Sequence, residues 1–336
     1  MKMKSKFLAG AVAVCLALGC LSGCDEKSSS LEGIEVYPES ARINLGEILR
    51  IEVAPVPRGA DAEFTWKSEN AEIASVSNYA AVSFLGIVEA EDVGNTQIVI
   101  SSGNFSKTVP IEVYEVTLQE KITALGVKGA WLFEDAGNLE LATAGQKLTA
   151  YKMDGNRSAG SPSLEGFAQV PGPTKRNHAV RVPKQSYFLC NHGFAAAGNG
   201  KVTEYTLLID VKVPKLQQYY SIFETDNLSL GSDGDFFIRP GADWGIRGNY
   251  TDKTRFEANK WFRMVVTVKG GKAKYYLNGK LIDEKEPGVD SHASWLPEGV
   301  LLFADEDGED NEFDIASVAI WDKALGDGDI ATLGGL

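Results

Sequence analysis

Short runs in which hydrophobic and polar residues alternate recur along this chain from residue 31 onward. The segments 96–101 and 111–113 alternate in this way, and in 206–213 the residues Leu207, Ile209, Val211 and Val213 share one face. A period of two residues, bounded by clusters of Gly, Pro and Ser, predicts half-buried β-strands. Another strand is expected over 261–268. Helical periodicity is weak and confined to 324–333, so the pattern predicts an all-β protein.

One turn signal defines a hairpin within this pattern. The segment 274–282 reads as two strands joined by Asn278-Gly279. These two residue types accept the positive φ angles that a type I′ turn requires at both central positions. We therefore expect a tight antiparallel hairpin at this point of the second domain.

The chain length and the changes in composition predict two folded domains behind a leader. The 336 residues exceed what one small domain needs. We expect a leader over 1–23, a polar tether over 24–30, a small domain over 31–116 and a large domain over 120–336. Six or seven short strands in the small domain fit a β-sandwich, and the longer strands of the large domain fit a jelly roll of two sheets.

The leader carries the marks of export and of lipid attachment. Three lysines precede the apolar stretch 7–18, which is too short for a permanent transmembrane helix. It ends in Leu21-Ser22-Gly23-Cys24, which resembles the lipobox of bacterial lipoproteins. The resemblance implies acylation of Cys24 and cleavage before it, with the lipid bilayer as a partner. Residues 17–20 are a weaker alternative, since Ala17 stands where the motif has Leu. We expect a lipid-anchored protein of the cell envelope, at the outer membrane or the cell surface.

Charge and cysteine content exclude some classes of function. The net charge is −13, and removing residues 1–23, with their three lysines and no acidic residue, lowers it to −16. Such a chain repels phosphate backbones, so we expect no nucleic-acid partner. Cys190 is the one cysteine beyond the leader and tether, which rules out an internal disulfide framework. It lies in an apolar run and is expected to pack as a small hydrophobe.

The small domain resembles a bacterial immunoglobulin-like domain of group 2. The resemblance is carried by Ile34-Glu35-Val36-Tyr37-Pro38, Leu45-Gly46-Glu47, Trp66-Lys67-Ser68-Glu69-Asn70, Ser75-Val76, Gly86-Ile87-Val88-Glu89-Ala90 and Gly94-Asn95-Thr96-Gln97-Ile98. It implies a spacer or an adhesion module. Trp66 is expected to fill the space between two sheets, and Gly86 and Gly94 are expected at turns that need positive φ.

The large domain resembles the laminin G-like jelly rolls of the concanavalin A-like lectin and glucanase superfamily. The matching landmarks are Gly129-Ala130-Trp131-Leu132-Phe133-Glu134-Asp135, Glu204-Tyr205-Thr206-Leu207, Trp261-Phe262-Arg263, Tyr276-Leu277-Asn278-Gly279, Leu301-Leu302-Phe303-Ala304-Asp305-Glu306-Asp307-Gly308 and 315–325. The resemblance implies binding of glycans or proteins, and in a minority of members the hydrolysis of polysaccharides. The fold expected for the whole chain is a small immunoglobulin-like sandwich followed by a larger concanavalin A-like jelly roll.

Hydrolysis is the less favoured function, because one carboxylate of the glucanase motif is missing. Glycosidases need two carboxylates with separate roles. The glucanase branch places them as Glu-x-Asp-x-x-Glu, whereas this chain has Glu312-Phe313-Asp314-Ile315-Ala316-Ser317. Ser317 replaces the acid/base, and the motif lies near the C-terminus. Whether the protein is an enzyme stays open here, with non-catalytic function preferred.

An acidic segment near the C-terminus is the candidate metal site. Its carboxylates surround Gly308 and belong to Asp305, Asp307, Glu309, Asp310, Glu312 and Asp314. Carboxylates so close together repel each other, and Ca²⁺ would relieve the repulsion. We expect Asp305, Asp307 and Asp314 as ligands of Ca²⁺. A solvated loop in which Asp314 caps neighbouring amides is the alternative.

A glycan site needs exposed aromatic rings beside planar polar groups. Candidates come from loop-like regions and are Tyr219, Tyr220, Asp243, Trp244, Tyr250 and Trp295. Trp244, within Pro240-Gly241-Ala242-Asp243-Trp244-Gly245, is the first choice. Trp131, Trp261 and Trp321 occupy strand positions and are expected in the core.

Three functions remain from the sequence. The first is a carbohydrate-binding surface lipoprotein whose jelly roll binds a polysaccharide without cutting it. The second is a protein-adhesion or structural module, and the third a hydrolase with an unrecognised site. The fold is compatible with all three, and fold alone does not decide function.

Overall fold

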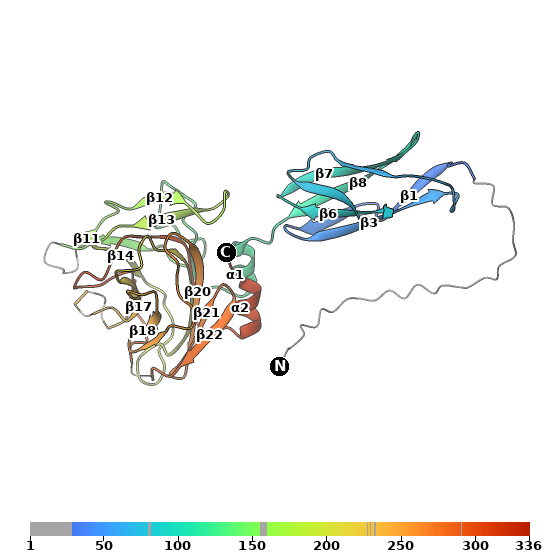
Figure 1. Ribbon diagram of the computed structural model, residues 1–336. Helices are drawn as coiled ribbons and strands as arrows, with labels where there is room; N and C mark the ends of the chain where they lie inside the picture. The colour runs from blue at the N-terminus through green and yellow to red at the C-terminus, as the bar shows by residue number, and fades with distance from the viewer. Residues whose placement is uncertain are drawn as a thin grey trace. The chain divides into compact units, whose positions relative to one another are not determined.

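The protein is described from a computed structural model (Figure 1). It describes residues 29–79, 82–154, 160–226, 228, 230, 231, 233–289 and 291–336. The lipobox and Cys24 lie outside these residues. The chain divides into two compact units, with the boundary between Val116 and Thr117. Strands form nearly all of the regular structure in both units, which confirms the all-β prediction.

The first unit is a sandwich of two four-stranded sheets. One sheet has the order β1 (Gly33–Tyr37), β3 (Ile48–Val56), β6 (Val82–Ala90), β5 (Ala74–Tyr79). The other has the order β2 (Ala41–Asn44), β8 (Phe105–Tyr114), β7 (Gly94–Ser102), β4 (Thr65–Ser68). Residues at alternate positions, such as Ile98 and Ile100, point into one buried core between the sheets.

Trp66 and Gly86 show how this core is filled. The Trp66 ring packs against the core, and its Nε1 donates to the carbonyl of Ser83 at 2.9 Å. A Cβ on Gly86 would come within 2.4 Å of the ring. The expectation of a turn with positive φ at Gly86 is wrong, because Gly86 lies within β6 and leaves room for the indole. Gly94, at the start of β7, does have a positive φ of 154°.

The second unit is a sandwich of two larger sheets. The sheet that we call the loop-covered sheet has the order β11 (Ser161–Pro162), β10 (Thr149–Lys152), β14 (Ser186–Cys190), β23 (Val300–Leu302), β16 (Tyr220–Glu224), β17 (Phe236–Ile238), β18 (Trp244–Ile246), β19 (Asn249–Thr251). The sheet that we call the helix-covered sheet has the order β12 (Ala168–Pro171), β13 (His178–Val182), β24 (Phe313–Trp321), β15 (Glu204–Lys212), β20 (Trp261–Lys269), β21 (Lys272–Leu277), β22 (Lys280–Lys285), with β9 (Gly129–Trp131) paired to β24. The pairings are antiparallel, as a jelly roll requires.

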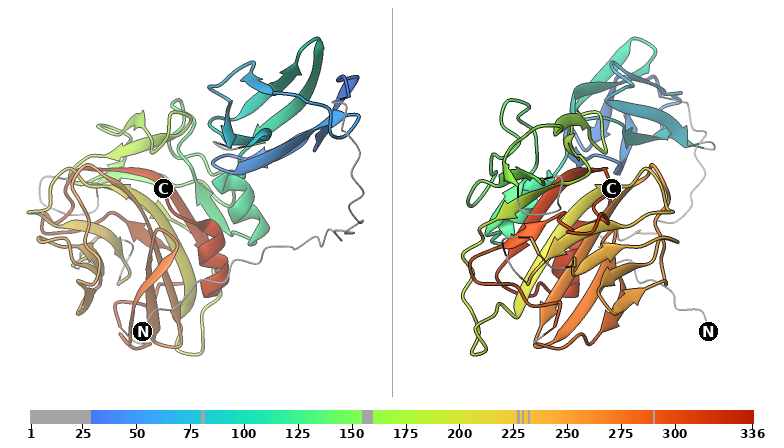
Figure 2. Two further views of the ribbon diagram at one scale, coloured as in Figure 1. Left: turned by 45° about the vertical axis from the view of Figure 1, so that its right-hand side comes forward. Right: turned by 90° about the vertical axis from the view of Figure 1, so that its left-hand side faces the viewer.

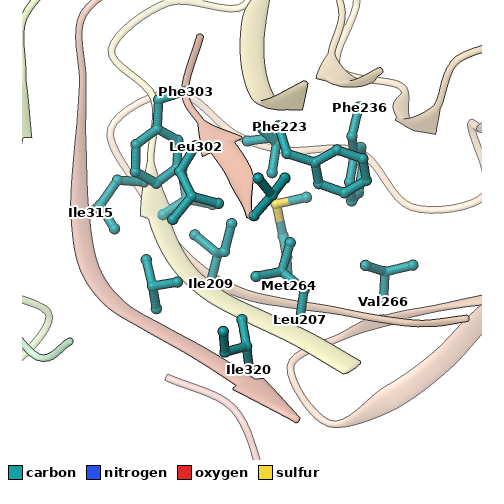
Figure 3. Packing of buried hydrophobic residues seen from close by; sticks show 14 of the residues in the cluster. Leu207, Ile209, Phe223, Phe236, Met264, Val266, Leu302, Phe303, Ile315 and Ile320 are labelled. Atoms are coloured by element: carbon teal, nitrogen blue, oxygen red, sulfur yellow. The ribbon is translucent and has the colours of Figure 1, made fainter. Parts of the chain in front are cut away.

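The core of the second unit lies between these sheets. Figure 3 shows Phe223, Phe236 and Leu302 of the loop-covered sheet facing side chains of the helix-covered sheet. The opposing residues include Leu207, Ile209, Met264, Val266 and Ile320. Cys190 is fully buried in the same core, as expected, and burial raises the pKa of its thiol.

Two short helices cover the outer face of the helix-covered sheet (Figures 1 and 2). They are α1 (Leu118–Ala124) and α2 (Asp327–Leu333), and they bury a second apolar layer against β15, β20, β21 and β24. Beneath α2, the buried Arg263 donates to both carboxylate oxygens of Asp210 at 2.8 Å and to the Leu333 carbonyl at 2.6 Å. The helices and this ion pair cover the outer face of the sheet where β15, β20, β21 and β24 run beneath them.

The two helices differ in how far the sequence predicted them. Helix α2 lies within the predicted 324–333 segment, whereas α1 was missed. Its start is nevertheless encoded by a capping box, in which Thr117 and Glu120 exchange hydrogen bonds. In the described part of the chain, neither helix is long and apolar enough to cross a membrane.

The predicted hairpin is confirmed. Strands β21 and β22 pair antiparallel around Asn278 and Gly279, whose φ angles are 48° and 76°. Of the tryptophans expected in the core, Trp131 and Trp321 are fully buried. Trp261 is only half-buried, because it starts β20 at the edge of the core and its ring lies under the Lys212 ammonium group at 4.9 Å.

Candidate functional site

Loops cover much of the outer side of the loop-covered sheet, and charged side chains gather at its β17–β19 end. Two loops fold over this side, 303–312 and the described residues of 225–235. The Ser221 hydroxyl donates to the Ala304 carbonyl at 2.5 Å, and Leu228 and Leu230 pack on Tyr187 and Leu301. Between the end of the sheet at β17–β19 and these loops lies a group of charged residues with one tyrosine. We call it the β17–β19 polar cluster, and it comprises Asp233, Arg239, Asp243, Arg247, Tyr250, Asp305, Glu306, Asp307 and Glu309.

Asp305 organises the acidic half of this cluster. It is fully buried, and its Oδ2 accepts the backbone N–H groups of Asp307, Gly308 and Glu309 at 3.2, 2.9 and 2.6 Å. Its Oδ1 accepts the N–H of Gly234 at 3.2 Å, which ties the 303–312 loop to the 225–235 loop. The buried carboxyl group of Asp305 therefore has four backbone N–H donors.

Further carboxylates surround Asp305. Oxygens of Asp233, Asp305 and Glu306 lie within 4.8 Å of one another, and so do oxygens of Asp305, Asp307 and Glu309. Burial is the larger cause, and repulsion from the neighbouring carboxylates the smaller one, that raises the pKa of Glu309 to about 7. Burial and the neighbouring carboxylates also raise the pKa of Glu306.

Asp310, the next residue along, is buried beside this loop. Neither of its carboxylate oxygens has a hydrogen-bond partner of good geometry, although the backbone amides of Gln185 and of Asp310 itself lie nearby. Burial raises its pKa to about 7, and Asp305 adds to the effect.

The basic half of the cluster faces the acidic half. Arg247 forms an ion pair with Asp233 at 2.8 Å. The Arg239 guanidinium lies 4.2 Å from the centre of the Tyr250 ring, and its Nη1 lies 3.6 Å from Oδ2 of Asp243. Burial raises the pKa of Tyr250 to about 12, against the effect of the two arginines, so its hydroxyl stays protonated and can donate a hydrogen bond.

Two of the predicted aromatic residues can therefore reach a ligand. Tyr250 and Tyr219 are both half-buried. Tyr219 packs edge-on against Phe237 at 5.9 Å, and its carbonyl accepts the Asn311 amide at 2.9 Å. Asp243, which lies beside Arg239, is also partly exposed. Three of the six predicted glycan contacts, Tyr219, Asp243 and Tyr250, therefore lie at the surface around β17–β19.

The other three are corrections, because their side chains are fully buried. Trp244 packs among Phe236, Phe256 and Tyr275 and donates to the Thr254 carbonyl. Trp295 stacks on Tyr205 at 3.9 Å. Tyr220 exchanges hydrogen bonds with the Lys215 backbone. None of the three can offer a ring face to a sugar, because each side chain is fully buried.

Asp314 is the remaining correction. The expected calcium ligands Asp305 and Asp307 lie together, but Asp314 lies on β24, where it pairs with Arg181 at 2.8 Å and Lys212 at 2.9 Å. These two cations neutralise it beside a small cavity of about 90 Å³. Asp314 is therefore not a ligand of the Asp305 cluster.

The residues that complete the cluster were not predicted from the sequence. Asp233, Arg239 and Arg247 lie in three successive connections before and after β17 and after β18, and they meet because these short strands pair side by side. In the sequence, the feature that could have pointed to these residues was their position beside turns rich in Gly and Pro. As assembled, the cluster offers hydrogen-bond donors and acceptors, one accessible tyrosine ring and a set of carboxylates that could hold a cation.

Comparison with known proteins gives a match for much of the second unit. Residues 194–331 match the sequence model of the concanavalin A-like lectin/glucanases superfamily. A search of curated proteins found no match. Residues 194–331 of the second unit thus match this superfamily by sequence, and the two antiparallel sheets of the unit agree with a jelly roll.

Solved structures with a similar fold are distant in sequence. Domain 4 of an extracellular arabinanase from Geobacillus stearothermophilus, solved with arabinotriose, is 16% identical, with a TM-score of 0.43, and the match covers 62% of this chain and 98% of that domain. The binding domain of Paraclostridial Mosquitocidal Protein 1 is 14% identical, with a TM-score of 0.41 and coverage of 65% and 52%. The binding domain of Botulinum neurotoxin serotype D is 16% identical, with a TM-score of 0.41 and coverage of 61% and 49%. The chain spans about half the length of these two toxin domains.

Proposed function

We propose that this protein is a lipid-anchored cell-envelope lipoprotein whose second unit binds carbohydrate without catalysis. The observation that carries the binding proposal is the β17–β19 polar cluster on the accessible side of a lectin-type jelly roll. The anchor is supported by the Leu21–Cys24 lipobox, and the first unit would serve as an immunoglobulin-like spacer.

The contacts within the cluster suit a sugar. Sugar rings present an apolar face and a rim of hydroxyls, so their sites combine an aromatic ring with planar polar groups. Tyr250 supplies the ring and a donor hydroxyl, Arg247 and Asp243 supply planar groups, and Tyr219 offers a second ring. Arg239 holds Tyr250 in place by lying against its ring, which preorganises the site.

Calcium would fit the acidic half of the cluster in part. Asp233, Glu306, Asp307 and Glu309 provide the hard oxygen ligands that Ca²⁺ prefers. Asp305 uses both of its oxygens to accept amide donors, so it would mainly shape the loop. We propose a Ca²⁺ ion at this loop with Asp307 and Glu309 as ligands, which would neutralise their mutual repulsion.

The test of carbohydrate binding is affinity electrophoresis against a panel of polysaccharides, followed by titration with the best ligand. Tyr250→Ala should weaken binding about 5- to 30-fold, since loss of one good aromatic contact costs about 1–2 kcal/mol. Tyr79→Ala is the matched control, because Tyr79 is an exposed tyrosine of the first unit. Unchanged binding in Tyr250→Ala would refute the site. The absence of binding to every glycan would refute the function.

Protein adhesion is the second candidate, and the first unit carries the observation that favours it. A groove of about 760 Å³ is lined by residues of β1, β3, β6 and β8, among them Tyr37 and Phe84, which are 75% and 56% exposed. Capture of an envelope protein that is lost in Tyr37→Ala and Phe84→Ala, with no glycan binding, would favour adhesion over the first proposal.

The anchor has a separate test. Labelling of growing cells with a fatty acid should mark the protein, and Cys24→Ala should abolish both the label and its recovery in the membrane fraction. Cys20→Ala is the control, since Cys20 belongs to the weaker alternative motif. Loss of the label in Cys20→Ala alone would move the anchor to that cysteine.

A further inference from the structure

A histidine and two carboxylates from separate loops meet at a place that the proposed glycan site does not use. Asp226 and Asp235 lie at the two ends of the loop between β16 and β17. His292 lies in the segment between β22 and β23, 57 residues after Asp235. One atom from each of the three lies within 4.8 Å of the others.

Asp235 is the fixed member of this group. It is completely buried, and its Oδ2 accepts two hydrogen bonds from Thr225, one from the backbone N–H and one from the hydroxyl, both at 2.6 Å. These bonds set the orientation of the carboxylate and leave its Oδ1 directed at the Nδ1 of His292, 2.5 Å away. A carboxylate held at one oxygen by neighbouring donors and offering the other is the usual arrangement of a preorganised metal ligand.

Asp226 distinguishes this group from an ordinary histidine–carboxylate pair. The pair of His292 and Asp235 alone would balance its charge if the imidazole were protonated. Asp226 brings a second carboxylate to the same place although its side chain is exposed and has solvent available. Two carboxylates with one imidazole leave negative charge that a dication would neutralise.

The donor set indicates the kind of ion. The acidic loop around Asp305 offers only oxygen atoms, which suits Ca²⁺. The present group offers one imidazole nitrogen and two carboxylate oxygens, and imidazole nitrogen favours zinc and similar transition metals over Ca²⁺. We propose that Asp226, Asp235 and His292 form a binding site for a divalent transition metal of the zinc type.

Such a site would join two loops of the jelly roll. The ligands come from the β16–β17 loop and from the β22–β23 segment, so the metal would link them and stabilise the folded form. Three protein ligands leave a further coordination position, which water or an oxygen atom of a ligand could occupy.

The test uses the mature chain with Cys24→Ser, so that the buried Cys190 is its one thiol. After treatment with a chelator, the protein is titrated with Zn²⁺ by calorimetry and with Co²⁺ by visible absorption, which reports nitrogen and oxygen ligation directly. We expect one ion per chain. His292→Gln and Asp235→Asn should each weaken binding at least ~100-fold, since both remove a ligand.

The matched control is His178→Gln. His178 also pairs with a carboxylate, Glu134, with Nδ1 and Oε2 2.7 Å apart, and both side chains are half exposed. In the part of the chain that the structure describes, this pair belongs to no three-residue group of metal-ligand type. The variant His178→Gln should therefore leave zinc binding unchanged.

The outcomes separate the possibilities. Loss of binding in His292→Gln with retention in His178→Gln supports the site. No zinc binding, or equal binding in His292→Gln, overturns it and leaves a structural hydrogen bond. Because Asp235 is buried, near-ultraviolet circular dichroism must show that Asp235→Asn is folded, and the more exposed His292 provides the decisive variant if it is not. Displacement of the zinc by excess Ca²⁺, or its loss in Glu309→Gln, would instead assign the ion to the Asp305 loop and overturn the proposal.

Discussion

Removing Asp210 should destabilise the second unit more than any change on its surface. Asp210 and Arg263 pair through two hydrogen bonds of 2.8 Å, and their side chains are only 2% and 5% exposed. In Asp210→Ala the guanidinium stays buried, with the Leu333 carbonyl as the other hydrogen-bond acceptor that the structure shows for it. An uncompensated buried charge of this kind costs about 3–5 kcal/mol. The same change should loosen α2, because Arg263 also holds its last turn.

The assay is urea unfolding, since urea does not screen charges. Buried tryptophans of the second unit, Trp131, Trp244, Trp295 and Trp321, report its unfolding by fluorescence. For a unit of this size the loss corresponds to a fall in Tm of roughly 6–20 °C, at about 2–4 °C per kcal/mol.

Two further variants make the result specific. Glu286→Ala breaks the exposed pair of Glu286 and Lys272 and should leave the urea midpoint unchanged. The double variant Asp210→Leu, Arg263→Met removes both charges and should recover part of the stability, because an apolar pair replaces a buried charge without a partner. An Asp210→Ala protein as stable as the parent would refute the reasoning, and so would a double variant less stable than the single one.

Three other outcomes follow from the packing. Burial lowers the pKa of His192 from 6.5 to about 4, so between these pH values the unfolded chain binds a proton that the folded chain does not. The free energy of unfolding should therefore fall by no more than about 3 kcal/mol as the pH drops from 6.5 to 4. Urea midpoints at pH 7 and 4.5 measure this fall, and His192→Phe should remove the part of the pH dependence that comes from His192. Gly86→Ala should lower the free energy of unfolding by about 1–3 kcal/mol, because the added methyl group overlaps the Trp66 ring. Gly33→Ala is the control, since its Cβ would meet its nearest atom at 3.7 Å, and equal stability of the two variants in thermal melts would contradict the packing argument. Trp244→Ala should lower stability by about 3–5 kcal/mol and leave the glycan affinity of the folded fraction unchanged; a selective loss of affinity by calorimetry would return this residue to the binding site.

The sequence alone determined the class of the fold and several of its elements. Alternation over 206–213 places Leu207, Ile209 and Val211 on one face, and those side chains do fill the core. The hairpin at Asn278-Gly279 was equally decided by local chemistry, because few residue pairs accept positive φ at two successive positions. Strand periodicity and turn chemistry act over a few residues, so the sequence displays them directly.

The tertiary structure decided which side chains are accessible. Trp244 stands between glycines and a proline, which favours a loop, yet it forms the short strand β18 and points into the core. Asp314 lies nine residues after Asp305, yet its partner Arg181 is 133 residues away. The group of Asp235 and His292 likewise depends on a contact between separate loops. Such contacts arise from the order in which strands join the two sheets, and local spacing carries no record of that order.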